Sequence, residues 1–140
     1  MKDTELRQEK DRELYSVYLR GLREHHFANM HEAVDWVRSQ PASKFYISSK
    51  ALVNYIGAMK NGKVPPKMFS CNEKKMKILY QMYLDFMQNN PGCKLSRERI
   101  CEILVEEPAP MFFICHDSCI KAIWRERSRR TKAMSNRYAK

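Results

Sequence analysis

The sequence predicts an all-α protein built from two tandem copies of a three-helix unit. The stretch "PASKFYIS" (Pro41 to Ser48) returns as "PAPMFFIC" (Pro108 to Cys115), sixty-seven residues later. Upstream of these stretches "LYSVYL" returns as "LYQMYL", and apolar positions match in the segments between. Such self-similarity is the sequence signature of a repeated structural unit. We therefore expect repeats over 1–66 and 67–140, packed together as one compact domain.

The first repeat contains three segments with helical periodicity. Thr4 to Glu24 is rich in charge, and its apolar residues fall close to the i, i+3, i+4 spacing of one helix face. A shorter helix over Met30 to Ser39 stops before Pro41, because the residue before a proline is driven out of the α region. The third helix begins at Ser49, a residue type that caps helix N-termini well.

The second repeat follows the same order. Its helices are expected from about Asn72 to Gln88, from Ser96 to Glu106, and from Asp117 onward, with Ser96 as a capping residue. On the last helix the apolar spacing predicts that Ile123 and Trp124 both turn inward.

The repeated motif itself predicts an extended connector between the second and third helices. Phe45 and Ile47 fall on one side of an alternating pattern, and Phe112 and Ile114 hold the matching positions in the second copy. A strand this short needs a partner. Two arrangements satisfy the pattern: a two-stranded antiparallel ribbon formed by 44–48 and 111–115, or extended connectors that lie over the core without pairing.

The distribution of charge indicates the class of partner. The net charge is +10, which favours association with a polyanion. Residues 41–75 carry seven Lys or Arg against one acidic residue, and residues 111–140 carry eight against two. The rest of the chain is slightly acidic. A basic surface in each copy is the electrostatic pattern typical of a nucleic-acid-binding protein.

The third helices supply the candidate contacts. Outward Lys and Arg side chains neutralise phosphates, and Asn54 can address an adenine edge if its helix enters a major groove. The second and third helices of each repeat, joined by a bend, resemble a helix-turn-helix in outline, with the basic third helix in the recognition position. The connector of about eight residues is longer than is usual for that motif. The predicted nucleic-acid-binding residues are Lys50, Asn54, Lys60, Lys63, Lys121, Arg125, Arg129 and Arg130, together with the C-terminal segment "RERSRRTKAMSNRYAK".

Double-stranded DNA is preferred over RNA as the partner, because the aromatic residues are expected in the core, which leaves few to stack on unpaired bases. The sequence predicts no enzyme, cofactor or metal, since it has neither a glycine-rich phosphate loop nor a nucleophile with a recognisable flanking motif. "CHDSC" (Cys115 to Cys119) lacks a second ligand pair nearby, which argues against a zinc site. Cys119 aligns with Leu52 of the first copy, so it is expected in the core. The absence of a long apolar run predicts no membrane span, while the charged N-terminus and the odd number of cysteines predict a cytoplasmic protein.

A resemblance to known proteins rests on the charged first helix, the basic C-terminal segment and two stretches, "EAVDWVRSQPASKFYIS" and "RICEILVEEPAPMFFIC". They resemble small duplicated helical proteins of Bacteroides-type bacteria and their mobile elements, in which a PAxxFYIS-like motif is repeated. The resemblance covers most of the chain and implies no activity. The alternative to DNA binding is therefore a structural or adaptor protein of a phage or mobile element, whose basic C-terminal segment docks on an acidic protein partner.

Overall fold

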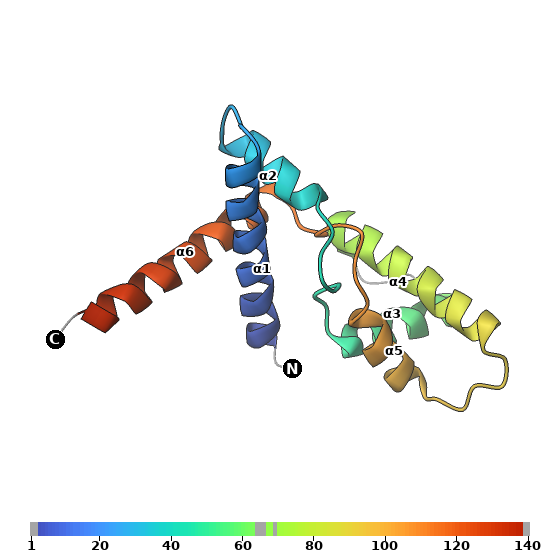
Figure 1. Ribbon diagram of the computed structural model, residues 1–140. Helices are drawn as coiled ribbons and strands as arrows, with labels where there is room; N and C mark the ends of the chain where they lie inside the picture. The colour runs from blue at the N-terminus through green and yellow to red at the C-terminus, as the bar shows by residue number, and fades with distance from the viewer. Residues whose placement is uncertain (1–2, 64–66, 69, 139–140) are drawn as a thin grey trace. The chain divides into compact units, whose positions relative to one another are not determined.

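A computed structural model gives the structure of residues 3–63, 67–68 and 70–138, and these residues form six α-helices (Figure 1). The all-α prediction is confirmed, and the helix bounds lie close to those predicted. No helix in this part of the chain is long and apolar enough to cross a membrane. Only the last two residues of the basic C-terminal segment lie outside the described ranges. The helices are α1 (Asp3–Glu24), α2 (Met30–Ser39), α3 (Ser49–Lys60), α4 (Ser70–Asn89), α5 (Arg97–Val105) and α6 (His116–Tyr138).

The helices form two compact units. Unit 1 combines Met1–Ala42 with Pro110–Lys140, and unit 2 is the continuous segment Ser43–Ala109. Within unit 1, α6 packs on α1 and α2; within unit 2, α3 packs on α4 and α5. The units therefore cut across the predicted repeats 1–66 and 67–140. Each unit joins the first two helices of one predicted repeat to the third helix of the other.

The core of unit 1 follows from the apolar stripes of its three helices. α2 starts where the Asn29 side chain accepts a hydrogen bond from the Glu32 amide at 3.0 Å, and the Glu32 carboxylate accepts one from the Ala28 amide at 2.9 Å. This reciprocal capping satisfies amides that have no partner inside the helix. The buried apolar residues of the unit include Leu14 and Val17 of α1, Val34 and Val37 of α2, and Cys119, Ala122 and Ile123 of α6.

Unit 2 repeats this scheme with its own helices. Ser48 caps α3 by accepting a hydrogen bond from the Ala51 amide, and Ser96 caps α5 by accepting one from the Arg99 amide, both at 3.2 Å. The predicted Ser96 cap is confirmed, whereas α3 is capped by the residue before the one predicted. The buried apolar residues of the unit include Leu52, Tyr55 and Ile56 of α3, Met76, Leu79 and Tyr83 of α4, and Ile100, Cys101 and Leu104 of α5.

The two-stranded ribbon is not formed, since the described residues contain no strand, and segments 44–48 and 111–115 are connectors without regular structure. Tyr46 has a positive φ of 53°, which interrupts an extended run. Each connector instead closes the end of a short helix in its own unit. The Phe45 amide donates to the Val105 carbonyl at 3.3 Å, and the Phe112 amide donates to the Arg38 carbonyl at 3.2 Å. These carbonyls lie in the last turns of α5 and α2, where intrahelical partners are missing.

Gly21 marks a close approach between α1 and the Trp36 side chain. A Cβ at Gly21 would lie 2.6 Å from Cζ3 of Trp36 and 2.8 Å from its Cε3, and His25 packs on the same indole. We expect Gly21→Ala to lower the free energy of unfolding by about 1–3 kcal/mol, the usual cost of overpacking. Urea denaturation monitored by circular dichroism measures this change.

Gly57 provides the matched control, because it also lies inside a helix but has room for a methyl group. The nearest atom to its added Cβ is an Arg97 guanidinium nitrogen at 3.5 Å. Gly57→Ala is expected to raise the free energy of unfolding by up to about 1 kcal/mol, the difference in helix propensity. Changes of the same sign at both positions would show that the Trp36 contact does not decide the effect.

Candidate functional site

A hollow of about 740 Å³ lies between α1 and α6 of unit 1. A smaller hollow of about 350 Å³ is lined by Thr4, Arg7, Gln8 and Arg129, the last three of which also line the larger one. We call the two hollows together the α1–α6 groove. The larger hollow is lined by Arg7 and Gln8 of α1 and by Lys121, Trp124, Arg125, Ser128, Arg129 and Lys132 of α6.

The groove is positively charged because basic residues of α6 that line it share one face of the helix. The α6 residues that line it recur every three or four positions, so they share one face of the helix, while Cys119 and Ile123 are buried on another. Five of the eight residues that line the larger hollow are Lys or Arg, and no described residue that lines either hollow is acidic.

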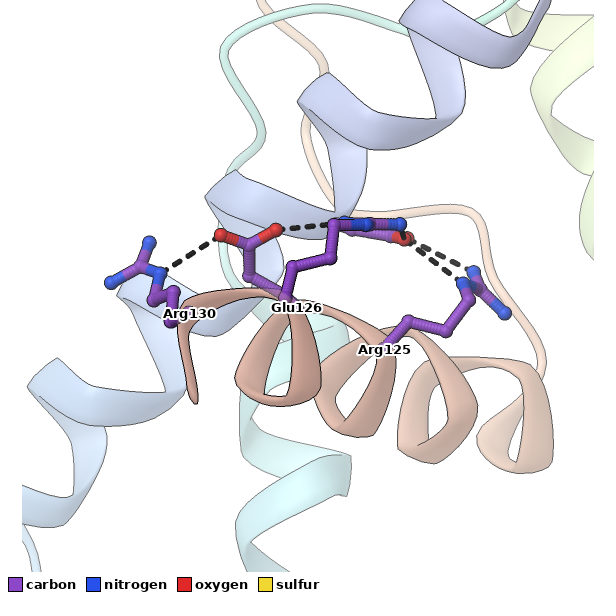
Figure 2. A network of polar contacts seen from close by, with 5 residues as sticks. Arg125, Glu126 and Arg130 are labelled. Atoms are coloured by element: carbon purple, nitrogen blue, oxygen red, sulfur yellow. Dashed lines mark hydrogen bonds and ion pairs between the residues drawn. The ribbon is translucent and has the colours of Figure 1, made fainter. Parts of the chain in front are cut away.

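A buried ion-pair network joins α1 to α6 beside this groove. Asp11 is 1% exposed, and its carboxylate accepts two hydrogen bonds from Arg125, each at 3.0 Å, and one from Arg129 at 2.7 Å. Glu126, also buried, accepts from Arg129 at 2.7 Å and from Arg130 at 2.8 Å. Figure 2 shows Glu126 between Arg125 and Arg130. Bidentate pairing of this kind fixes the orientation of a guanidinium, and it compensates carboxylates removed from water.

The network also determines which groove residues carry uncompensated charge. The hydrogen bond to Asp11, together with the one to Glu126, raises the pKa of Arg129 above the ordinary value for arginine, so this side chain stays charged. Arg125 and Arg129 are each about one-third exposed while they hold Asp11. By contrast, Arg7, Lys121 and Lys132 form no ion pair with any residue that the structure describes. These three side chains are available to an anionic ligand.

Trp124 does not turn inward, so this part of the sequence prediction is wrong. Its side chain is 46% exposed and lines the groove, and the Arg127 guanidinium carbon lies 5.1 Å from the ring centre. The buried face of α6 is completed by Cys119, Ala122 and Ile123. Trp124 lies at the edge of that face and lines the groove together with Arg7 and Gln8 of α1.

The predicted binding residues are divided between the two units. Lys121, Arg125 and Arg129 line the groove, whereas Arg130 pairs with Glu126 and lies over the Tyr15 ring at 4.6 Å. The other four belong to α3 of unit 2 and the turn that follows it, and they do not line this groove. Lys50, Asn54 and Lys63 are exposed there, and the Lys60 ammonium lies 5.1 Å from the centre of the Tyr83 ring.

Sequence reasoning missed Arg7, Gln8 and the exposure of Trp124, whereas Ser128 and Lys132 lie within the predicted C-terminal segment but were not singled out in it. Lys132 and Ser128 continue the spacing of Lys121 and Arg125 along α6, which was a usable signal. Arg7 gave no such signal, because it is far from α6 in the sequence.

The cysteine motif gives no second site. Among the described residues, no group of three or more His, Cys, Asp or Glu side chains could hold a metal ion. Cys119 is fully buried, as expected for a core residue, and burial raises the pKa of its thiol to about 11. The thiol therefore stays protonated at neutral pH.

Comparisons with protein-family models, curated proteins and solved structures find no significant match. The groove therefore has to be interpreted from its own residues. The helix-turn-helix-like arrangement stays a prediction, because α2 and α3 belong to different compact units.

Proposed function

We propose that the protein binds nucleic acid through the α1–α6 groove, without catalysing a reaction. The observation that carries the proposal is the lining of the groove by five Lys or Arg residues with no described acidic residue among them. Lys and Arg that neutralise phosphates release condensed counterions, which is the main sequence-independent contribution to nucleic-acid affinity. The net charge of +10 adds long-range attraction for the same ligand.

The groove offers two kinds of cation to a phosphate backbone. Arg125 and Arg129 are held by Asp11, so part of each guanidinium is presented in a fixed orientation at little further cost in side-chain entropy. Arg7, Lys121 and Lys132 are not fixed in this way, and they can follow phosphates in different positions. A fixed centre with adaptable cations around it suits binding that does not depend on base sequence.

We also propose that the fold arose by tandem duplication of a three-helix unit. Two equivalent backbone hydrogen bonds support this proposal, from Phe45 to Val105 and from Phe112 to Arg38. Phe45 and Phe112 are separated by sixty-seven positions, as are Arg38 and Val105. The same offset relates Ile56 to Ile123, both of which are buried.

The proposed duplication helps to locate the binding site, because the basic residues that α6 contributes to the groove have no basic counterparts among the described residues of α3 and the turn after it. The offset pairs the groove residues of α6 with small or neutral residues of α3 and the turn that follows it. We therefore place the site on unit 1 rather than on two related surfaces. Lys121, Trp124, Arg125 and Arg129 correspond to Asn54, Gly57, Ala58 and Gly62.

The test reverses the three unpaired cations of the groove together, as Arg7→Glu, Lys121→Glu and Lys132→Glu. Arg125 and Arg129 are left in place because they hold Asp11. Binding of labelled oligonucleotides, followed by fluorescence anisotropy across a salt series, is expected to weaken at least roughly tenfold at low salt. The plot of log affinity against log salt should also become shallower, by about 0.7–0.9 for each phosphate that the variant no longer neutralises.

A matched variant separates the groove from net charge. Lys67→Glu, Lys74→Glu and Lys94→Glu together change the net charge by the same amount at exposed positions of unit 2. If both variants lose equal affinity, the interaction is general attraction and the groove is not the site. If the wild-type protein binds no nucleic acid at low salt but binds polyglutamate, the proposal fails and an adaptor for an acidic protein is favoured.

A further inference from the structure

An exposed tryptophan inside a basic groove is an unusual combination. Large aromatic side chains usually contribute their area to the core, whereas Trp124 leaves 46% of its surface accessible. It does so among the Lys and Arg residues of the groove, with Lys121 and Ser128 on the neighbouring turns of the same helix face. A cationic groove that carries an aromatic platform is the arrangement by which proteins bind single-stranded nucleic acid.

The indole is suited to stacking. The Arg127 guanidinium lies 5.1 Å from the ring centre, a cation–π contact that helps to hold the ring in place. Every base has a π face, so a single ring can stack on any of the four bases without reading sequence.

The shape of the site favours an unpaired strand over a duplex. Reading base edges in the major groove requires a helix or a β-ribbon that projects into it, whereas Trp124 lies in a hollow between α1 and α6. Within a duplex the base faces are covered by their neighbours, and a side chain reaches them only by unstacking a step. A single strand leaves its bases free to turn toward the ring. Lys121 and Lys132 are eleven residues apart on α6, or roughly 16 Å along its axis, which leaves room for more than one nucleotide.

We propose that the α1–α6 groove binds single-stranded nucleic acid, with one unpaired base stacked on Trp124 and the flanking phosphates on Arg7, Lys121 and Lys132. This inference rests on the proposed function and specifies its substrate class. It replaces the preference for duplex DNA, which depended on the aromatic residues being in the core.

The first test compares Trp124→Ala with the wild-type protein on a labelled single strand and on a duplex of the same sequence. We expect Trp124→Ala to bind the single strand about tenfold or more weakly, and the duplex with little change. Trp124→Phe keeps an aromatic face and should restore much of the loss. Because the side chain is half exposed, neither substitution is expected to unfold the helix, which circular dichroism checks.

The second test uses tryptophan fluorescence. The chain has two tryptophans, and Trp36 packs against His25 and Phe27 away from the groove lining. Stacking of a base on Trp124 should quench the emission of the wild-type protein when oligo(dT) is added. The same titration of Trp124→Phe should leave the remaining emission nearly unchanged.

The outcomes separate this inference from the proposed function. If single strand and duplex both bind, Trp124→Ala binds them as tightly as the wild-type protein, and no quenching occurs, then stacking is wrong while nucleic-acid binding stands. If the wild-type protein binds neither form, both proposals fail. Loss of single-strand affinity that Trp124→Phe restores, with quenching confined to Trp124, would establish the inference.

Discussion

Asp11→Asn is expected to lower the free energy of unfolding by about 2–4 kcal/mol, a large share of the stability of a small domain. The substitution keeps the shape of the side chain but removes the charge that accepts three hydrogen bonds from Arg125 and Arg129. It also turns an amide N–H₂ group toward guanidinium donors that cannot accept from it. The loss stays below that of a fully buried pair, because water reaches the two guanidiniums, each about one-third exposed. The shift of the urea denaturation midpoint measures the change.

Glu73→Gln provides the control for this measurement. Glu73 pairs with Lys77 at 3.2 Å on the surface of α4, and both side chains are more than half exposed. We expect a loss below about 0.5 kcal/mol, as for other exposed pairs on helices. Equal shifts for the two variants would contradict the expectation that the buried Asp11 network between α1 and α6 stabilises the fold more than an exposed pair does.

The second large effect concerns which parts of the chain fold independently. A fragment of residues 43–109 is expected to keep its helical circular dichroism and to unfold cooperatively, because all the helices that α3 packs on are present. A fragment of residues 1–66 has nearly the same length but separates α3 from α4 and α5, and α1 from α6. We expect it to lose most of its helix content, since short helices are marginal without tertiary packing.

Thermal melts of the two fragments, monitored by circular dichroism, make this comparison directly. A cooperative transition in residues 1–66 and none in residues 43–109 would mean that the sequence repeats are the folding units. It would then be wrong to assign α3 to unit 2 and α6 to unit 1.

The sequence was sufficient to predict the individual helices. Their apolar spacing is local information, and so are the Ser96 cap and the stop before Pro41. The sequence left the ribbon and the unpaired connector open, because alternation over five residues satisfies both. Tyr46 adopts a positive φ that its residue type rarely takes, and the pattern contained no sign of it.

The pairing of helices could not be predicted in the same way. The third helices of the two predicted repeats have matching apolar stripes, so the pattern does not say which pair of helices each one covers. In the structure, the pairing of helices depends on contacts between residues far apart in the sequence, such as Asp11 with Arg129, 118 positions apart. Charge at position 11 was visible in the sequence, but its burial was not.

The candidate site was predicted in part for a related reason. Lys121, Arg125 and Arg129 were found because they lie outward on one helix, whereas Arg7 joins them only through the packing of α1 on α6. Trp124 was assigned to the core because periodicity defines a stripe but not its width. Whether a residue at the edge of a stripe is covered depends on the side chains opposite.

The division of unit 1 between the two ends of the chain has a consequence during synthesis. Unit 2 is continuous, so it can fold once residue 109 has left the ribosome, and domains generally fold as units in the order in which they emerge. α1 and α2 are synthesised before unit 2, but their apolar faces stay uncovered and Asp11 stays without Arg125 and Arg129 until α6 has been synthesised. A nascent chain that stops before His116 therefore holds one finished unit beside two helices with exposed apolar faces, the kind of surface that chaperones exist to protect.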